Sequence, residues 1–493
     1  MSSGQTNLND SHFPRAEVTG APGLQWRRAR LVKTLLQERR GQDVGPAGNS
    51  SLLRLAGRAT AVWAVMVQAT MLWLYWVPAP KTLWGDEVTY LAAAQRLLAT
   101  GSAGLDTLWP PLAPHFLAGV LSVSFGSLFP LHVLQLGLLL VAALLLRDLA
   151  ARICGSRLAG TVAALLLLAD PTMAAFATYL WPEVLHAFLF LAVLWVLVLR
   201  PDRPAWLAIG GTALGLALLT KSLLGPFVPI LLLPFFLSRP RGRSLARAAL
   251  LVGVAAAIVA PVIISNGLSR DAFVVSDSSR FNLWVGLNDS SPKSMVNDIA
   301  GREYQAYLES APDFRGRQAV LAGKISAYVR QRGVLAILRE QLGRQYFRLF
   351  DRDSYLDDQL PGGPSHASGA GYPSPAPWLA RTVHAYSHAH YAMVLVATAF
   401  GVVAFRSRPH PWMRVILAFL AYNLGVFLLL HVKSRYRLQF VPFLELLAGV
   451  GLAGLWAQVK GVAAPIGPWR IAAATGLALL LLLLAFGGTL LPE

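Results

Sequence analysis

Long apolar runs alternate with polar segments along almost the whole chain. A helix needs about 20 apolar residues to cross the hydrocarbon layer of a bilayer, so each run predicts a membrane span. The pattern therefore predicts an all-α polytopic membrane protein. The eleven predicted spans are residues 59–78, 131–147, 158–175, 184–199, 205–220, 222–237, 247–265, 389–405, 412–431, 437–457 and 470–490.

A further apolar segment, residues 112–129, is bracketed by prolines and interrupted by serines and a glycine. If it lies on the membrane surface, the basic loops share the side of the basic N-terminal segment, as the positive-inside rule requires. If it crosses, those loops move to the opposite side and the total becomes twelve spans. Charge therefore favours an interfacial helix. The basic loops contain Arg147, Arg152, Arg157, Arg200, Arg203, Arg239, Arg241, Arg243, Arg247, Arg406, Arg408, Arg414, Lys460 and Arg470.

The composition supports a membrane protein, and in a membrane protein the net charge has a different interpretation. The chain is 55% hydrophobic and 14% charged, with a formal net charge of +18. In a soluble protein this charge would suggest nucleic acid, but here most arginines lie in short loops between spans and set the orientation. We expect membrane lipids as partners and no nucleic acid.

This orientation divides the chain into four parts. Residues 1–50 lack an apolar run and predict a disordered basic cytoplasmic tail. Residues 51–265 form an N-terminal transmembrane module whose first outer loop is 79–130. Residues 266–388 form an outer loop domain, with a strand-like alternation in 276–291 and helical spacing in 317–350. Residues 389–493 carry the C-terminal transmembrane helices.

Two adjacent carboxylates, Asp86 and Glu87, directly follow the first predicted span. An ionised acid is costly at a membrane and usually marks function there. The alternative interpretation is a solvated loop carboxylate that merely ends a helix. These two acids are therefore the first candidates for catalysis.

Two groups of cations lie on the outer side, against the positive-inside rule. Lys221 stands at the turn between two spans, and Lys433, Arg435 and Arg437 form a cluster before or at the start of another. Arginine and lysine bind phosphate through charge-assisted hydrogen bonds, so an anionic ligand at this face would explain them. The alternative is that they extend toward lipid headgroups.

The order of these motifs resembles a known family. From about residue 58 to 457 the chain is similar to membrane glycosyltransferases of the GT-C class, in the protein mannosyltransferase and aminoarabinose transferase superfamily. The chain departs from the aminoarabinose transferases at Trp109, where they have an acidic-basic pair. The motifs are Gly85-Asp86-Glu87 with Tyr90, Pro110-Pro111, Trp181-Pro182-Glu183, Leu219-Thr220-Lys221, Phe281-Asn282 with Gly286 and Asn288, and Ser434-Arg435-Tyr436 with Pro442.

The resemblance implies a GT-C fold and an inverting transfer of a sugar from a polyprenyl-phosphate donor. The acceptor would be a glycan, a lipid or a protein at the extracytoplasmic face of the cell membrane. It implies Asp86 as the catalytic base or as the acid that positions the acceptor, with Glu87 beside it and Glu183 as the second acid. The implied donor phosphate contacts are Lys221, Arg435, Tyr436 and Lys433, and the further candidate substrate contacts are Tyr90, Asp170, Asn282 and Asn288.

Two alternatives stay open. The carboxylates Asp86, Glu87 and Glu183 offer hard oxygen ligands, so a divalent cation is an option although no separated ligand set identifies one. The histidines at 384, 388 and 390 fit a solvated loop end better than a metal site. The rival function is a transporter or flippase of a lipid-linked envelope precursor, but such proteins tend to show internal repeats and ionisable residues at the midplane.

Overall fold

The computed structural model describes residues 50–237, 241–289, 299–373, 375–404, 410–463 and 465–490. The predicted tail, residues 1–50, lies outside this part except for Ser50. Residues 60–493 form one unit of packed helices, and the described residues before them begin helix α2.

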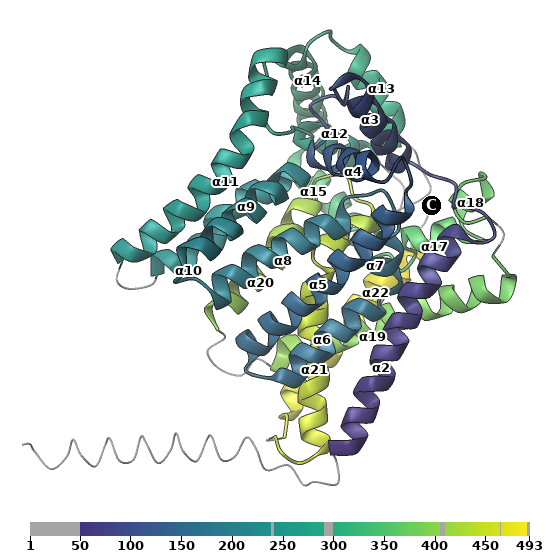
Figure 1. The fold of residues 1–493 in the computed structure, drawn as a ribbon, viewed down its shortest axis with the longest axis vertical. Helices are drawn as coiled ribbons and strands as arrows, with labels where there is room; N and C mark the ends of the chain where they lie inside the picture. The colour runs from purple at the N-terminus through teal and green to yellow at the C-terminus, as the bar shows by residue number, and fades with distance from the viewer. Residues whose placement is uncertain are drawn as a thin grey trace, which may run out of the picture. The chain divides into compact units, whose positions relative to one another are not determined.

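The described chain is helical, as predicted, and contains no strand beyond an isolated bridge between Thr82 and Gly371. Six of its helices are long and apolar enough to cross a membrane, and other apolar helices have 10–17 residues. All eleven predicted spans coincide with apolar helices (Figure 1). These are α2 (Ser50–Trp76), α5 (Phe129–Cys154), α6 (Arg157–Ala169), α8 (Glu183–Leu199), α9 (Pro204–Thr220), α10 (Val228–Leu237) with η2 (Ser222–Phe227), α11 (Arg241–Arg270), α19 (Pro377–Ala404), α20 (Pro411–Phe427), α21 (Val441–Val459) and α22 (Pro468–Phe486).

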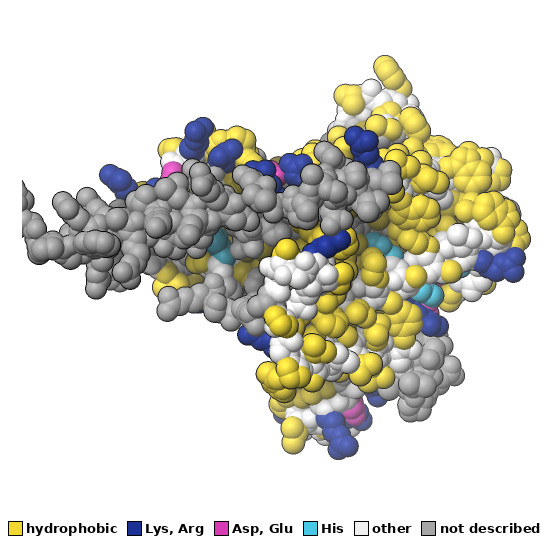
Figure 2. Space-filling model, turned by 90° about the horizontal axis from the view of Figure 1, so that it is seen from below, with side chains coloured by type: hydrophobic (Ala, Val, Ile, Leu, Met, Phe, Trp, Pro, Cys, Tyr) yellow, Lys and Arg dark blue, Asp and Glu magenta, His cyan; other side chains and the backbone are white. Residues whose placement is uncertain are grey.

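The helices differ in how much of their surface meets other helices. α8 is apolar on all sides and buried on most of them, as expected of a central helix. α19 and α21 approach closely because Gly401 faces the Leu447 carbonyl and Gly451 faces the Ala397 carbonyl, where no Cβ would fit. Other helices leave large apolar side chains exposed, and these cover much of the face in Figure 2. Such a surface is expected where lipid replaces water.

The segment that decides the topology forms α4 (Leu112–Val123). Its 12 residues make a helix about 18 Å long, which is shorter than the roughly 30 Å of bilayer hydrocarbon. α4 packs against α3 (Asp86–Thr100) and touches α5 and α9. α6, which corresponds to a predicted span, has only 13 residues, so the length of α4 does not decide between the two interpretations and its position stays a prediction.

The described part of residues 266–388 is mainly helical, and one prediction there was wrong. The segment 276–291 was expected to be strand-like, but α12 (Ser279–Asn288) is a helix. Phe281 and Val285, one helical turn apart, are buried together against Tyr307 and Leu321 of the neighbouring helices. The helical spacing of 317–350 is confirmed. The helices are α13 (Ile299–Glu309), α14 (Phe314–Arg332), α15 (Val334–Leu342), α16 (Gln345–Phe350), α17 (Tyr355–Gln359) and α18 (Pro364–Ala367).

Two span boundaries also differ from prediction. The span 158–175 ends early, because the Asp170 side chain caps a new helix, α7 (Pro171–Phe176). The span 389–405 begins too late, since α19 starts at Pro377. His384, His388 and His390 therefore lie on a helix and not at a loop end. His390 is only 5% exposed, which contradicts the solvated position expected for it.

Candidate active site

The site lies at one common end of several helices. Asp86 opens α3 after the C-terminal end of α2, and Glu183 opens α8. Lys221 follows the C-terminal end of α9, and Arg435 lies in η3 (Ser434–Gln439), just before α21. Because successive spans run in opposite directions, segments distant in sequence meet at this end.

Asp86 and Arg435 form an ion pair across 349 residues of sequence, with Arg435 Nη2 2.5 Å from Asp86 Oδ2. Gly85 positions Asp86, because its φ of 59° and ψ of −131° suit glycine and not an L side chain. The Asp86 side chain is 30% exposed and that of Arg435 is 14% exposed. The carboxylate is therefore reachable while the cation is largely enclosed.

Three aromatic rings surround the Arg435 guanidinium. Its centre lies 4.9 Å from the Trp181 ring, 5.5 Å from the Tyr355 ring and 5.4 Å from the Tyr436 ring. Burial alone would lower the pKa of Arg435, but the nearby Asp86 charge and further acidic groups outweigh it and hold the pKa well above the usual value. Arg435 is thus a permanent cation in an aromatic enclosure.

A second ion pair lies nearby, with Lys221 Nζ 3.3 Å from Glu183 Oε1. Burial raises the pKa of Tyr90 well above the usual value, and the charges of Asp86 and Glu183 add to this effect. Glu183 also acts on Arg435. The two ion pairs therefore belong to one electrostatic cluster, although they come from four segments of the chain.

Glu87 points away from this cluster, into a buried pair with Lys81, and both side chains are 0% exposed. Glu87 Oε2 also accepts from the Trp84 backbone N–H at 3.2 Å, and Oε1 accepts from that of Leu180 at 3.1 Å. Burial lowers the pKa of Lys81, although Glu87 opposes this effect. Glu87 therefore ties the first outer loop to the segment that carries Trp181 and Glu183.

Tyr436 and Tyr90 lie around the cluster, and Lys433 is two residues before Arg435 in the chain. The Tyr436 ring stacks on Phe427 at 5.6 Å, and Tyr90 meets the edge of Trp109 at 5.4 Å. Lys433 lies close enough to Asp358 to affect it: burial raises the pKa of Asp358, while Lys433 opposes the rise.

Three predicted substrate contacts lie in other surroundings. The Asn282 carbonyl accepts from the His431 N–H at 2.7 Å, which ties α12 to the segment before η3. Asn288 Nδ2 donates to the Trp284 carbonyl of its own helix at 2.8 Å. Asp170 Oδ1 accepts from the Thr172 N–H at 2.7 Å as the cap of α7. Their observed contacts do not bring them to Asp86.

Sequence reasoning did not select three residues of this region. Trp181 belongs to the Trp181-Pro182-Glu183 motif and could have been predicted as an aromatic partner for a cation. Tyr355, in the outer loop region, and Lys81 gave no local signal, because only folding brings Tyr355 to Arg435 and buries Lys81.

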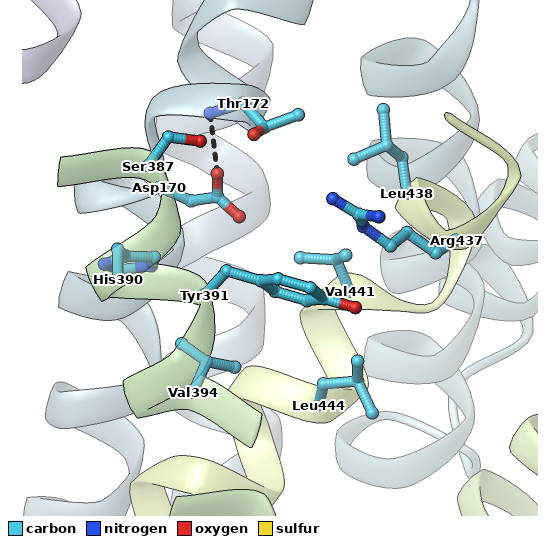
Figure 3. Close-up of a pocket in the computed structure, with 10 residues that line it drawn as sticks. All are labelled: Asp170, Thr172, Ser387, His390, Tyr391, Val394, Arg437, Leu438, Val441 and Leu444. Carbon is cyan, nitrogen blue, oxygen red and sulfur yellow. Dashed lines mark hydrogen bonds between the residues drawn. The ribbon is translucent and has the colours of Figure 1, made fainter. Parts of the chain in front are cut away.

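The predicted acids each meet a cation, which leaves them poorly arranged as a joint metal site. Within the described part of the chain, the histidine and acidic side chains whose donor atoms have metal-like spacing are Asp170, His390 and Glu445. They line or adjoin a different pocket, shown in Figure 3.

Comparison with known proteins gives one family match. Residues 109–265 match the family described as dolichyl-phosphate-mannose-protein mannosyltransferase. No curated protein matches the chain. A solved structure, that of ArnT from Cupriavidus metallidurans bound to undecaprenyl phosphate, has 16% identity and a TM-score of 0.36, and the alignment covers 86% of this chain and 82% of that one. At that score the structural likeness adds no support. The family match includes Glu183 and Lys221 but neither Asp86 nor Arg435.

Proposed function

We propose that this chain, whose residues 109–265 match the mannosyltransferase family, is a glycosyltransferase of the GT-C class that transfers a sugar from a polyprenyl-phosphate donor to an acceptor hydroxyl. The observation that carries the proposal is the ion pair between Asp86 and Arg435, beside the pair between Glu183 and Lys221. Together they place a reachable carboxylate next to enclosed cations.

The chemistry needs a base and a cationic site, and phosphate is a good leaving group without a general acid. Asp86 accepts the proton of the acceptor hydroxyl as the hydroxyl oxygen forms a bond to the anomeric carbon. The bond from that carbon to the phosphate oxygen breaks, and its electron pair stays on the phosphate. Arg435 and Lys221 stabilise this charge. Attack opposite the leaving group inverts the anomeric carbon.

The resting ion pair prepares both partners. Arg435 has five N–H donors, so its guanidinium can bind a phosphate while it stays near Asp86. When a phosphate binds Arg435, it shares the N–H donors that the resting ion pair gives to Asp86, so the Asp86 carboxylate is freed to meet the acceptor hydroxyl. Lys221 can likewise bind a phosphate while it stays near Glu183. Tyr436 and Lys433 are the further proposed contacts to the donor phosphate.

Glu87 acts as a positioning residue in this scheme. Its hydrogen bonds to the backbone of Trp84 and Leu180 hold the loops that carry Asp86 and Trp181. It needs no contact with substrate for that role.

The charge distribution of the loops supports an extracytoplasmic site, and the acceptor class is a glycan, a lipid or a protein. A flippase or transporter is the rival proposal. It predicts movement of an intact lipid-linked precursor across the membrane, without cleavage of the sugar phosphate bond.

The test uses Asp86→Asn in membrane vesicles supplied with a panel of radiolabelled polyprenyl-phosphate sugars. We expect the rate of label transfer from donor to acceptor to fall by about 10²- to 10⁴-fold, or about 3–5 kcal/mol in barrier, at unchanged expression. Asp271→Asn is the matched control, because Asp271 is exposed at a positive φ that asparagine tolerates. Near-normal transfer by Asp86→Asn would refute the assignment of the base, and intact donor moving across the vesicle membrane without label transfer would support the rival.

A further inference from the structure

A second polar cluster lies in the helix bundle, apart from the ion pairs of the candidate active site. It combines Asp170 at the α6–α7 junction, His390 of α19 and Glu445 of α21. One donor atom from each lies within 4.8 Å of the others. In Figure 3, Asp170 and His390 lie along one side of the adjoining pocket and Arg437 extends from the other.

Two side chains of this cluster, Glu445 and His390, are buried and have polar atoms without a hydrogen-bond partner in the described part of the chain, whereas Asp170 is partly exposed and caps α7. Glu445 is 0% exposed, and in the described structure neither of its carboxylate oxygens has a hydrogen-bond partner. His390 is 5% exposed, and its Nε2 has no partner among the described residues. An ionised carboxylate buried without a partner is very unfavourable, so Glu445 must be neutralised by a bound proton or by a cation.

Three other buried acids of the described chain have a lysine or a histidine beside them. Glu87 has Lys81, Glu183 has Lys221, and Asp357 Oδ1 lies 2.9 Å from His384 Nδ1. For Glu445, the nearby arginine is engaged elsewhere. Arg437 lies 4.3 Å from the Tyr391 ring centroid and donates to the Asp351 carbonyl. The protein therefore supplies carboxylates here but directs its cation to other partners.

We propose that Asp170, His390 and Glu445 bind a divalent transition-metal ion such as Zn²⁺ or Mn²⁺. Donor atoms bound at about 2.0–2.2 Å from one ion lie about 3–4 Å apart, and the three donor atoms here, all within 4.8 Å of one another, need only a small shift to reach that spacing. An imidazole with two carboxylates is a donor set for transition metals, whereas Ca²⁺ and Mg²⁺ prefer oxygen ligands alone. The two negative charges of Asp170 and Glu445 balance a divalent ion in the apolar bundle.

The ion would join three elements that already pack together, because α21 contacts both α6 and α19. Glu445 lies in the first turns of α21, and η3 with Arg435 directly precedes that helix. A metal here would fix the helix start that carries the active-site arginine. The proposed role is structural, and it does not depend on the identity of the sugar or acceptor.

The experiment measures metal content and thermal unfolding of the full-length protein in detergent. After incubation with Zn²⁺ or Mn²⁺ and removal of free ion, we expect about one bound ion per chain by elemental analysis. A strong chelator should lower the unfolding temperature of the wild type, because binding to the folded state alone stabilises it. The Mn²⁺ form should give an electron paramagnetic resonance spectrum of a bound ion.

Variants locate the ion. Glu445→Gln and His390→Gln should each reduce metal content at least tenfold and remove the effect of the chelator, since each deletes one ligand. His388→Gln is the matched control, because His388 lies on the same helix beside Asp353 and outside the cluster. It should keep the metal.

Several results would overturn the proposal. A wild type without bound Zn²⁺ or Mn²⁺, and with no response to chelator, would show that protons compensate Glu445. If Glu445→Gln retains the metal but His388→Gln loses it, the ion is bound at His384 and His388 and not at the proposed cluster. If Glu445→Gln does not fold, the wild-type metal content and chelator response together with His390→Gln still decide between these outcomes.

Discussion

Two acidic groups lie near the same end of the helices, and they handle their charge in different ways. In the candidate active site, Asp86 and Glu183 meet Arg435 and Lys221 from distant parts of the chain. In the second cluster, Asp170 and Glu445 gather beside His390 without an arginine or lysine partner in the described structure. The acids of the first group have their cations within the protein, whereas those of the second have no lysine or arginine partner among the described residues.

This difference suggests two kinds of ligand. Where a carboxylate is already paired with a cation, that cation can bind an anionic substrate as well, because it can be shared between the two anions at little cost in free energy. A buried carboxylate without a partner calls instead for a cation. Arg435 and Arg437 show the division, since they are two residues apart in η3 yet contact different rings, Trp181 and Tyr391. One short helix thus contributes to both regions.

The largest expected effect comes from removing the cation that pairs with a buried acid near the candidate active site. That acid would then lack a cationic partner, as Glu445 does in the second cluster. Lys81→Met would leave Glu87 buried without its cation, and we expect a loss of about 3–5 kcal/mol in stability. The measurement is thermal unfolding and monodisperse yield in detergent. The double variant Lys81→Met with Glu87→Gln removes both charges and should recover most of the loss. Equal destabilisation in both variants would contradict the view that the unpaired charge is responsible.

A smaller effect, on catalysis and not on folding, is expected at Arg435. Arg435→Met should slow sugar transfer by about 10²- to 10³-fold, because one preorganised donor to the developing phosphate charge is lost. The measurement is the initial rate at saturating and limiting donor. Arg435→Lys keeps the charge but not the planar stacking on Trp181, so we expect a loss between those of wild type and Arg435→Met. Full activity in Arg435→Met would remove Arg435 from the donor site.

The smallest effect is expected at Tyr90. Burial and the neighbouring carboxylates raise its pKa, so the phenol stays protonated through the working pH range and keeps its O–H to donate to a bound substrate. Tyr90→Phe should therefore lower the transfer rate by at most about tenfold, the value of one hydrogen bond. The pH dependence of the rate should keep its shape. Disappearance of its alkaline limb in this variant would show that Tyr90 titrates during catalysis.

Local pattern was a good guide where one property decides the outcome. Hydrophobic runs located the membrane helices because burial in lipid demands apolar length regardless of neighbours. Local pattern failed at α12. There an alternation of apolar residues was compatible with a strand, but packing of Phe281 and Val285 on one helix face stabilises a helix. It also failed for His390, whose burial follows from the early start of α19 at Pro377.

The sequence by itself determined a helical membrane protein, its approximate spans and the types of charged residue at their ends, because these depend on composition and periodicity alone. Only the tertiary structure decided which charges meet. It placed Arg435 on Asp86 and Lys221 on Glu183, paired Glu87 with Lys81, and left Glu445 beside Asp170 and His390. The physical reason is that an ion pair depends on distance in space, and contacts across hundreds of residues leave no trace in local pattern.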